Sequence, residues 1–293
     1  MRVTSQMMVD QSIANMNQGA ERLNELQNRA ATGKQFQVAS DDPSRAATSL
    51  TLNSTISRNA GTLTSLGTTG DWLSGTLQAL QQMLDLGTQA QSVAKQGLSD
   101  TQGAAERTAL GKQMDALLQE AVSVADNTQN GQYLFAGFQV NTVPFTYAGG
   151  AVTYNVASTA GPIQHSLGSG QQLTVNIDGN ATFKPLFDSL ASARDALLNN
   201  DPAALQAALT NLASAANGVS AANSLTGTRS QQVASTVDLL TQTQTSLKTL
   251  LSQNEDANMA ETLSLLAQQQ TVYQSSVQVG SRVLPSSLFD FLK

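Results

Sequence analysis

Cysteine is absent from this chain of 293 residues, and histidine occurs only once. Without cysteine the protein has no disulfides, no cysteine-ligated metal site and no thiol catalysis. A single histidine, His165, excludes a histidine-rich zinc or iron site. General-base catalysis also needs a positioned partner, and the sequence around His165 supplies no such constellation. We therefore expect a histidine at the surface or in a turn.

Charged side chains make up only 12% of the chain and aromatic side chains only 4%. The usual charged share is about 25%, and here Gln, Asn, Ser, Thr, Ala and Gly fill the difference. The 15 basic residues are scattered and the net charge is −6, which opposes binding to nucleic acid, since phosphate binding needs clustered Lys and Arg. We expect helices that pack through small side chains, under a neutral and weakly acidic surface.

Long apolar runs are missing as well. No stretch approaches the roughly eighteen apolar residues that a membrane-spanning helix needs. The first residues, MRVTSQMMVDQSIANMNQ, lack the apolar core of a cleaved secretory signal. If the protein leaves the cell, we expect a route that cleaves no N-terminal signal.

Motifs for catalysis or phosphate binding are also lacking. The chain has no strand-to-helix Gly-rich loop and no Gly-Lys-Ser/Thr motif. Residues 131–183 contain no HExxH motif and no paired carboxylates of the kind a hydrolase requires. Asp41 and Asp42 fit a capping loop before Pro43 better than a metal site. The sequence thus predicts no enzyme, no cofactor and no metal.

Helical spacing of apolar residues covers most of the chain. The predicted helices span about 5–32, 43–97, 104–128, 186–197, 202–252 and 254–293, with Asp201-Pro202 as one starting signal. Glycine-rich stretches predict a bend or a weak spot within 61–75, and they allow a break near 218–227. Trp72 is expected to pack within the bundle, and Arg229 either makes a polar contact between subunits or is exposed.

The period changes in the middle of the chain. From Gly131 to Phe183 the alternating runs YLFAGF, AVTYNV and QQLTVNID are separated by Gly-rich turn clusters, which indicates a small antiparallel β-region. The predicted fold is mainly α with this β insertion. We expect an elongated antiparallel helical bundle or coiled coil, with both termini at one pole and the β-region at the other.

Both terminal segments carry a narrow apolar stripe that another helix must cover. At the C-terminal end the stripe follows a strict 4-3 spacing: Met259, Leu263, Leu266, Gln270, Tyr273, Val277, Gly280 and Leu284. At the N-terminal end it is looser: Val3, Met7, Ile13, Met16, Ala20, Leu23, Gln27 and Ala30. The covering helix is either the other terminal segment or a helix of another subunit, and the pattern leaves both open.

Three domains follow from this organisation. Residues 1–42 and 253–293 form a terminal helical polymerisation domain, which we expect to be disordered in the monomer and ordered in a polymer. Residues 43–130 and 185–252 form a helical bundle domain. Residues 131–184 form a small, β-rich outer domain.

Four segments, in order, carry a family resemblance that covers nearly the whole chain. They are residues 21–50 (ERLNELQNRAATGKQFQVASDDPSRAATSL), 131–145 (GQYLFAGFQVNTVPF), 171–190 (QQLTVNIDGNATFKPLFDSL) and 254–292. The first and last are similar to the two ends of the bacterial flagellin superfamily. The two middle segments resemble its L-type hook-associated branch, the proteins of the hook–filament junction.

The resemblance implies a structural subunit of the bacterial flagellum that joins the hook to the flagellin filament. It implies export in an unfolded state through the flagellar type III channel and an extracellular location at the junction. The implied partners are a K-type hook-associated protein, flagellin, further copies of the chain in a ring and a cytoplasmic flagellar export chaperone, with no nucleic acid and no membrane. A minor filament flagellin and a flagellin-like secreted adhesin are the alternatives.

Subunit assembly is the site role that the sequence predicts. We assign it to apolar residues of both ends that would bury against neighbours: Val3, Met7, Ile13, Met16, Leu23, Leu26, Met259, Leu263, Leu266, Tyr273, Val277, Leu284, Leu288 and Phe289. Full burial of each large side chain contributes about 1.5–3 kcal/mol. Many such contacts together can offset the cost of ordering the ends.

Overall fold

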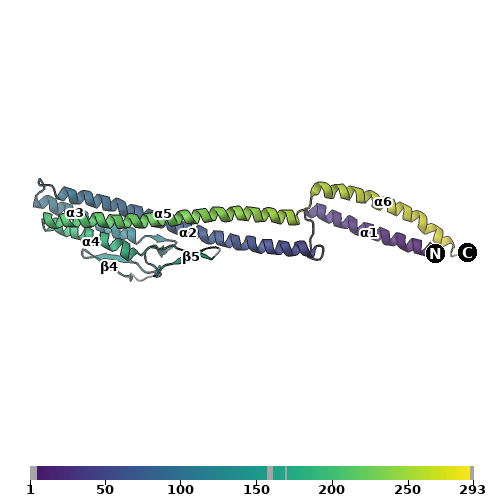
Figure 1. Ribbon diagram of the computed structural model, residues 1–293, viewed down its shortest axis with the longest axis horizontal. Coiled ribbons are helices and arrows are strands. Elements are labelled where there is room, and N and C mark those ends of the chain that lie inside the picture. Colours follow the sequence, from purple (N-terminus) through teal and green to yellow (C-terminus); the bar gives the residue numbers. More distant parts are fainter. Residues whose placement is uncertain (1–4, 157–160, 169, 291–293) are drawn as a thin grey trace. The chain divides into compact units, whose positions relative to one another are not determined.

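The computed structural model describes residues 5–156, 161–168 and 170–290, with side chains described at residue 7 and at 9–281 within those ranges. The helices are α1 (Ser5–Thr32), α2 (Pro43–Gly97), α3 (Ala104–Ala125), α4 (Gly179–Leu198), α5 (Pro202–Glu255) and α6 (Met259–Asp290) (Figure 1). The strands are β1 (Thr128–Gln129), β2 (Gln132–Tyr133), β3 (Phe145–Ala148), β4 (Ala151–Tyr154), β5 (Gln164–Gly168) and β6 (Gln171–Thr174). The predicted class, mainly α with a small antiparallel β insertion, is confirmed.

The chain divides into two compact units, each built from two stretches of sequence. The terminal unit comprises Met1–Arg58 and Thr243–Lys293, and so contains α1, α6, the start of α2 and the end of α5. The central unit comprises Asn59–Gln242 and contains the remaining helices and all the described strands.

Local signals set the helix starts. Asp42 accepts a hydrogen bond from the backbone N–H of Arg45 (3.0 Å), and Asp201 accepts two from Ala203 and Ala204 (3.0 Å each). Each of these aspartates precedes a proline whose fixed φ suits the first helical position. The predicted starts of α2 and α5 are therefore confirmed.

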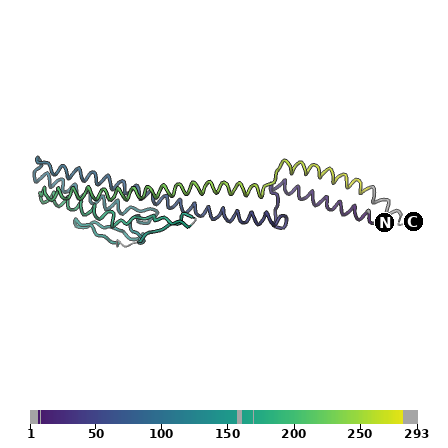
Figure 2. Tube along the Cα trace, viewed as in Figure 1, coloured from purple at the N-terminus to yellow at the C-terminus, as the bar shows by residue number. Residues whose placement is uncertain are grey.

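Both long helices are continuous, so the break near 218–227 is absent, and the glycines at 61–75 do not interrupt α2 (Figure 2). A glycine costs a helix about 1 kcal/mol. Tertiary burial along the same stretches outweighs that cost, because Leu66 and Leu73 of α2 and Val219 and Thr226 of α5 are almost fully buried.

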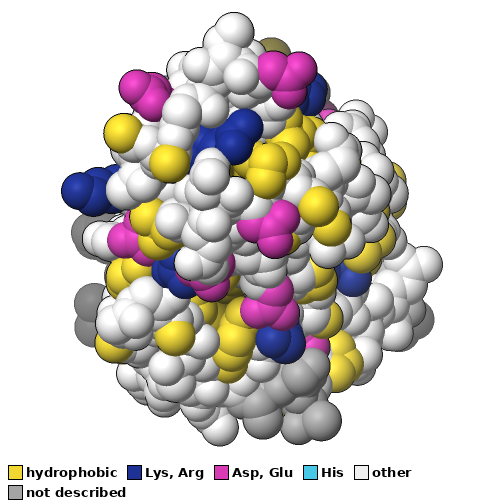
Figure 3. Space-filling view, turned by 90° about the vertical axis from the view of Figure 1, so that its left-hand side faces the viewer, with side chains coloured by type: hydrophobic (Ala, Val, Ile, Leu, Met, Phe, Trp, Pro, Cys, Tyr) yellow, Lys and Arg dark blue, Asp and Glu magenta, His cyan; other side chains and the backbone are white. Residues whose placement is uncertain are grey.

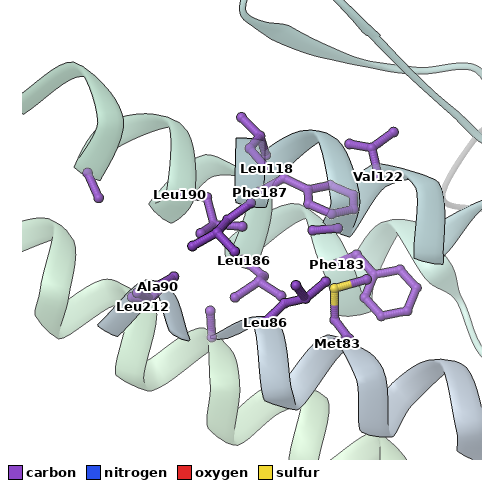
Figure 4. Close-up of a cluster of buried hydrophobic side chains, with 14 of the residues drawn as sticks. Met83, Leu86, Ala90, Leu118, Val122, Phe183, Leu186, Phe187, Leu190 and Leu212 are labelled. Carbon is purple, nitrogen blue, oxygen red and sulfur yellow. The ribbon is translucent and has the colours of Figure 1, made fainter. Parts of the chain in front are cut away.

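The main core of the central unit is formed by α2, α3, α4 and the first half of α5. Figure 4 shows side chains from these helices converging, and the labelled ones are Met83, Leu86, Ala90, Leu118, Val122, Phe183, Leu186, Phe187, Leu190 and Leu212. None of these is more than 4% exposed. Many of the other core residues are alanines, as the low aromatic content predicted.

The β-region consists of three separate two-stranded antiparallel hairpins, β1–β2, β3–β4 and β5–β6. The predicted strands AVTYNV and QQLTVNID are confirmed in part, as β4 and β6. The predicted strand YLFAGF is wrong beyond Tyr133, because Leu134, Phe135 and Ala136 are all buried in succession. A half-buried strand alternates between two faces, whereas this segment turns and inserts into the core.

An aromatic cluster explains the GQYLFAGF…PF segment. Phe135 meets Phe183 edge-on with ring centroids 4.7 Å apart, and Phe145 meets Phe187 at 5.4 Å. Such edge-to-face pairs add about 0.5–1.5 kcal/mol beyond simple burial. The segment therefore anchors the β-region on α4.

A polar cluster fixes the β3–β4 hairpin on α3 and α4. Arg194 donates from Nη1 to Asp115 (3.0 Å) and to the carbonyl of Gly150 in the hairpin turn (2.5 Å), and Tyr147 donates to Asp115. Burial opposes ionisation of Asp115, but the hydrogen bonds from Tyr147 and Arg194 outweigh it and hold its pKa below the ordinary value. The hairpin is thus held by polar as well as apolar contacts.

A second, smaller core lies under the β5–β6 hairpin. Its buried members are Leu66, Leu73, Leu167, Leu173, Val175 and Val233, with Trp72 half-buried between the two cores as predicted. His165 of β5 is half-buried, with its Nδ1 2.6 Å from Thr69 Oγ1. Arg229 is half-buried rather than fully exposed, and its Nη1 donates to the carbonyl of Asn176 (3.1 Å) within the same unit.

The surface matches the composition. On the side of the molecule where α3 and α4 lie, Figure 3 shows mostly uncharged polar and backbone atoms, with basic and acidic side chains scattered singly or in small groups. Apolar side chains occur there in small separate groups.

Candidate assembly surface on the terminal helices

In the terminal unit, α1 and α6 lie side by side and antiparallel (Figure 1). Gln269 of α6 donates to the carbonyl of Gly19 (3.3 Å), and Tyr273 lies against the same glycine. The less exposed residues of the pair define the seam: Val9, Ser12, Met16, Gly19, Ala20, Leu23, Leu26, Arg29 and Ala30 in α1, and Thr262, Leu266, Gln269, Tyr273, Ser276 and Gly280 in α6. Apart from Ala20 and Arg29, both sets follow a 3-4 spacing, so the heptad character is confirmed.

The seam of α6 is rotated from the predicted one. Of the predicted stripe, Leu266, Tyr273 and Gly280 lie in the seam, while Met259 and Leu263 are exposed. The helices approach where side chains are small; a Cβ added at Gly280 would come within 2.9 Å of the sulfur of Met16. The face of α6 that meets α1 is therefore the one whose glycine allows close approach, and not the one with the larger aliphatic side chains.

This rotation leaves an apolar face beside the seam. At 100° per residue, the aliphatic residues on one flank of both helices project to the same side. We call these residues the apolar face: Ile13 (43% exposed), Leu23 (half-buried, at the edge of the seam), Met259 (39%), Leu263 (52%) and Val277 (39%). All five belong to the predicted assembly set.

A second apolar stripe lies on the other flank of the seam, and the sequence prediction missed it. Leu265, Val272 and Val279 recur at seven-residue intervals and are 44%, 49% and 59% exposed. They line two hollows of about 390 and 370 Å³, whose α1 side is largely polar and includes Arg22 and Glu25. The seven-residue interval between these three aliphatic residues is visible in the sequence and could have predicted the stripe. The longer 4-3 stripe beside it was taken as the whole apolar surface of the helix.

The other predicted assembly residues fall elsewhere. Met7 is 61% exposed, and Leu26 is buried between the two helices. Val3 lies outside the described residues, as do the side chains of Leu284, Leu288 and Phe289.

A cluster of charges lies at the base of the helix pair, where the segment after α1 meets the segment before α6. Lys34 donates from Nζ to Glu255 (3.0 Å) and to Asp256 (2.7 Å). Lys34 and Asp256 also pair as an antiparallel bridge: the N–H of Gln35 donates to the carbonyl of Glu255 (2.7 Å), and the N–H of Ala257 donates to the carbonyl of Gly33 (2.8 Å).

The protonation states suit this pairing. The hydrogen bond to Asp256, then that to Glu255, raise the pKa of Lys34, and the hydrogen bond from Lys34 lowers the pKa of Asp256. Nearby, Asn254 donates from Nδ2 to the carbonyl of Arg45 (2.9 Å) and to the hydroxyl of Ser49 (2.8 Å). The base of the helix pair is thus held by polar contacts.

The described residues show neither a metal site nor a membrane-spanning helix. They contain no group of three or more His, Asp or Glu side chains placed to hold a metal ion. Within the same residues, no helix is long and apolar enough to cross a membrane.

Family models match both ends of the chain. The model of the bacterial flagellin N-terminal helical region matches residues 3–140, and that of the bacterial flagellin C-terminal helical region matches residues 209–292. The matched parts contain α1 to α3 on one side and most of α5 and α6 on the other.

Two relatives from enteric bacteria are both flagellar hook-associated protein 3. The flagellar hook-associated protein 3 of Escherichia coli K12 is 25% identical over 320 aligned residues, which cover 100% of both chains. The flagellar hook-associated protein 3 of Salmonella typhimurium LT2 is 25% identical over 194 residues, which cover 63% of this chain and 60% of that relative.

Solved structures share the fold. The crystal structure of Bacillus cereus FlgL matches with a TM-score of 0.62 at 22% identity, over 69% of this chain and 99% of that chain. That of Xanthomonas campestris FlgL (space group C2) matches with a TM-score of 0.59 at 16% identity, over 67% of this chain and 99% of that chain.

Proposed function

This chain belongs to the bacterial flagellin family, and we propose that it is the structural subunit that joins the flagellar hook to the flagellin filament. The hook-associated name of its full-length relative supports this role. The observation that carries the mechanism is the apolar face, which the fold of the single chain leaves uncovered.

In this role the terminal helices act as the assembly element. Ile13, Leu23, Met259, Leu263 and Val277 bury against the helices of neighbouring subunits, at about 1.5–3 kcal/mol for each large side chain fully buried. Contiguous exposed apolar surface on a soluble chain marks an interaction site. The neighbours we propose are further copies in a ring, a K-type hook-associated protein on the hook side and flagellin on the filament side.

Export and location belong to the same proposal. The chain reaches the outside of the cell unfolded, through the flagellar type III channel and with a cytoplasmic chaperone, and assembles at the hook–filament junction. A chain without disulfides suits passage in an unfolded state. The protein acts through its contacts and not as an enzyme.

The test is complementation of a strain from which this chain has been deleted. We expect Leu263→Asp combined with Val277→Asp to abolish filaments while the protein is still exported, because two carboxylates cannot be buried at a subunit interface. The matched control is Ser264→Asp with Gln278→Asp, two exposed positions on the far side of α6. Equal motility of the two double variants would refute the assembly role of the apolar face.

Labelling of the complemented cells separates this role from the alternatives. A junction subunit gives one focus at the hook end of each filament. A minor flagellin or a flagellin-like adhesin gives label along the filament, and that result would overturn the proposal.

A further inference from the structure

The seam between α1 and α6 is poorly suited to fix how far one helix is shifted along the other. Several of its positions are small or polar, including Ser12, Gly19, Ser276 and Gly280. Register in a helix pair comes from large knobs that fit only one set of holes, or from polar groups that pair in only one way. A slip of seven residues, about 10 Å along the axis, returns the same two faces to each other.

Contacts at the base of the pair fix the register of α1 against α6. The antiparallel bridge places Lys34 opposite Asp256, with one backbone hydrogen bond on each side of it. Gly33 has φ of +70°, a left-handed conformation suited to glycine, so α1 ends at a defined residue directly before the bridge. The same register continues along the pair, where Gln269 donates to the carbonyl of Gly19.

The charges at this point are selective. One ammonium group lies between two carboxylates, and the backbone bridge holds it there. After a slip of seven residues in one direction, residue 34 would face Thr249 in place of Asp256, and the ammonium group would lose both carboxylates. A polar residue at a single position of a coiled coil fixes the register of the helices without adding stability. The opposite charges act in the same way here.

We propose that Lys34, Glu255 and Asp256 form a charge latch that sets the register of α1 against α6, and so aligns the two halves of the apolar face. Only the consequence for assembly rests on the proposed function. The latch itself is a property of the single chain, because all three residues lie in the terminal unit.

The absence of cysteine makes register directly measurable. In the full-length monomer, the pair Gly19→Cys with Tyr273→Cys reports the observed register, since a Cβ at Gly19 would lie 3.5 Å from the Tyr273 ring. The pair Gly19→Cys with Leu266→Cys reports a slip of one heptad. The quantity measured is the ratio of the two disulfide yields under mild oxidation.

We expect the observed register to dominate in the parent chain, and Lys34→Glu to lower the ratio about fivefold, the effect of an exposed ion-pair network. Combining Lys34→Glu with Glu255→Lys and Asp256→Lys restores opposite charges and should restore the ratio. Lys184→Glu, which breaks an ion pair within α4, is the matched control and should change nothing.

Three results would overturn the latch. The ratio could stay unchanged in Lys34→Glu, which would assign register to the seam. Both disulfides could vanish with the helical content retained, which would mean that the charges hold the pair together rather than in register. The parent chain could itself show equal yields. None of these readouts involves the flagellum, so failure of the latch is distinct from failure of the proposed function.

Discussion

At the scale of the residue, Asp126 shows how one buried carboxylate links the fold to pH. It follows the last residue of α3 and accepts a hydrogen bond from the N–H of Phe145 (3.1 Å), but burial raises its pKa from 3.8 to about 6. A carboxylate at a helix C-terminus also faces the negative end of the helix dipole. The folded state therefore favours the protonated form.

The sign of the pH dependence follows from this shift. Because the pKa of Asp126 is higher in the folded state than in the unfolded state, protonation of Asp126 stabilises the fold. This stabilisation is complete below pH 3.8 and is lost as the pH rises through about 6. Asp126→Asn keeps an acceptor for Phe145 but cannot ionise. We expect it to have a higher Tm than the parent at pH 7.5 and a similar Tm near pH 3.5, measured by circular dichroism. Asp85→Asn, at an exposed position, is the control; an equal Tm difference at both pH values would contradict the assignment.

Two glycines in helices of the central unit should respond oppositely to alanine. A Cβ at Gly179 would lie 2.6 Å from the Phe135 Cβ and 2.7 Å from its carbonyl oxygen, which the backbone cannot easily move. We expect Gly179→Ala to lower the free energy of unfolding by about 1–3 kcal/mol. Gly218 has open space around it, and Gly218→Ala should raise that energy by about 1 kcal/mol. Urea unfolding measures both, and the same sign for both variants would contradict this account.

At the scale of the element, glycine-to-alanine substitutions test whether α2 is an unbroken helix. The sequence predicted a bend or a weak spot at 61–75, whereas Gly61, Gly67 and Gly70 lie in a continuous helix with no atom within 4 Å of an added Cβ. Replacing all three by alanine should therefore stabilise the protein by up to about 1 kcal/mol each. A lower Tm for the triple variant would mean that the chain bends there and needs glycine.

The elements that could be predicted are those whose signals are local. The starts of α2 and α5 depend on Asp-Pro pairs, and α1 ends at Gly33 because a left-handed residue terminates a helix there. The rotation of the α6 seam could not be predicted, because it depends on how closely Gly19 and Gly280 let two distant segments approach. The turn after Tyr133 could not be predicted either. Apolar and aromatic residues are typical both of a strand and of a turn whose successive side chains are buried, so the residue types do not distinguish the two.

The same limit applies to the assembly set. Ile13, Leu263 and Val277 were predicted to bury against neighbouring subunits, and the structure of the single chain leaves them exposed. Whether a given stripe residue faces its own partner helix or a neighbour depends on a rotation of about 100° per residue. Leu266 and Val277 belong to one sequence stripe, yet Val277 is exposed and Leu266 lies in the seam.

At the scale of the whole molecule, the two units differ in what holds them together. The central unit has a core of some thirty buried residues from four helices and the β-region. Among the described side chains of α1 and α6, Leu26, Thr262 and Gly280 are buried, and the rest are partly or fully exposed. An isolated helix pair with so little buried apolar area is marginal in water. We therefore predict that the terminal helices open far more often than the central unit in the free monomer.

Amide hydrogen exchange measures this difference in the free and assembled protein. In the monomer, amides of α1 and α6 should exchange at least about tenfold faster than those of α3 and α4, because local opening follows buried contact area. Assembly should slow exchange in α1 and α6 alone, since neighbours then cover the apolar face. Leu263→Asp with Val277→Asp should prevent that slowing while leaving α3 and α4 unchanged. Equal protection of both units in the monomer would mean that the seam suffices by itself, and that assembly adds contacts without ordering the ends.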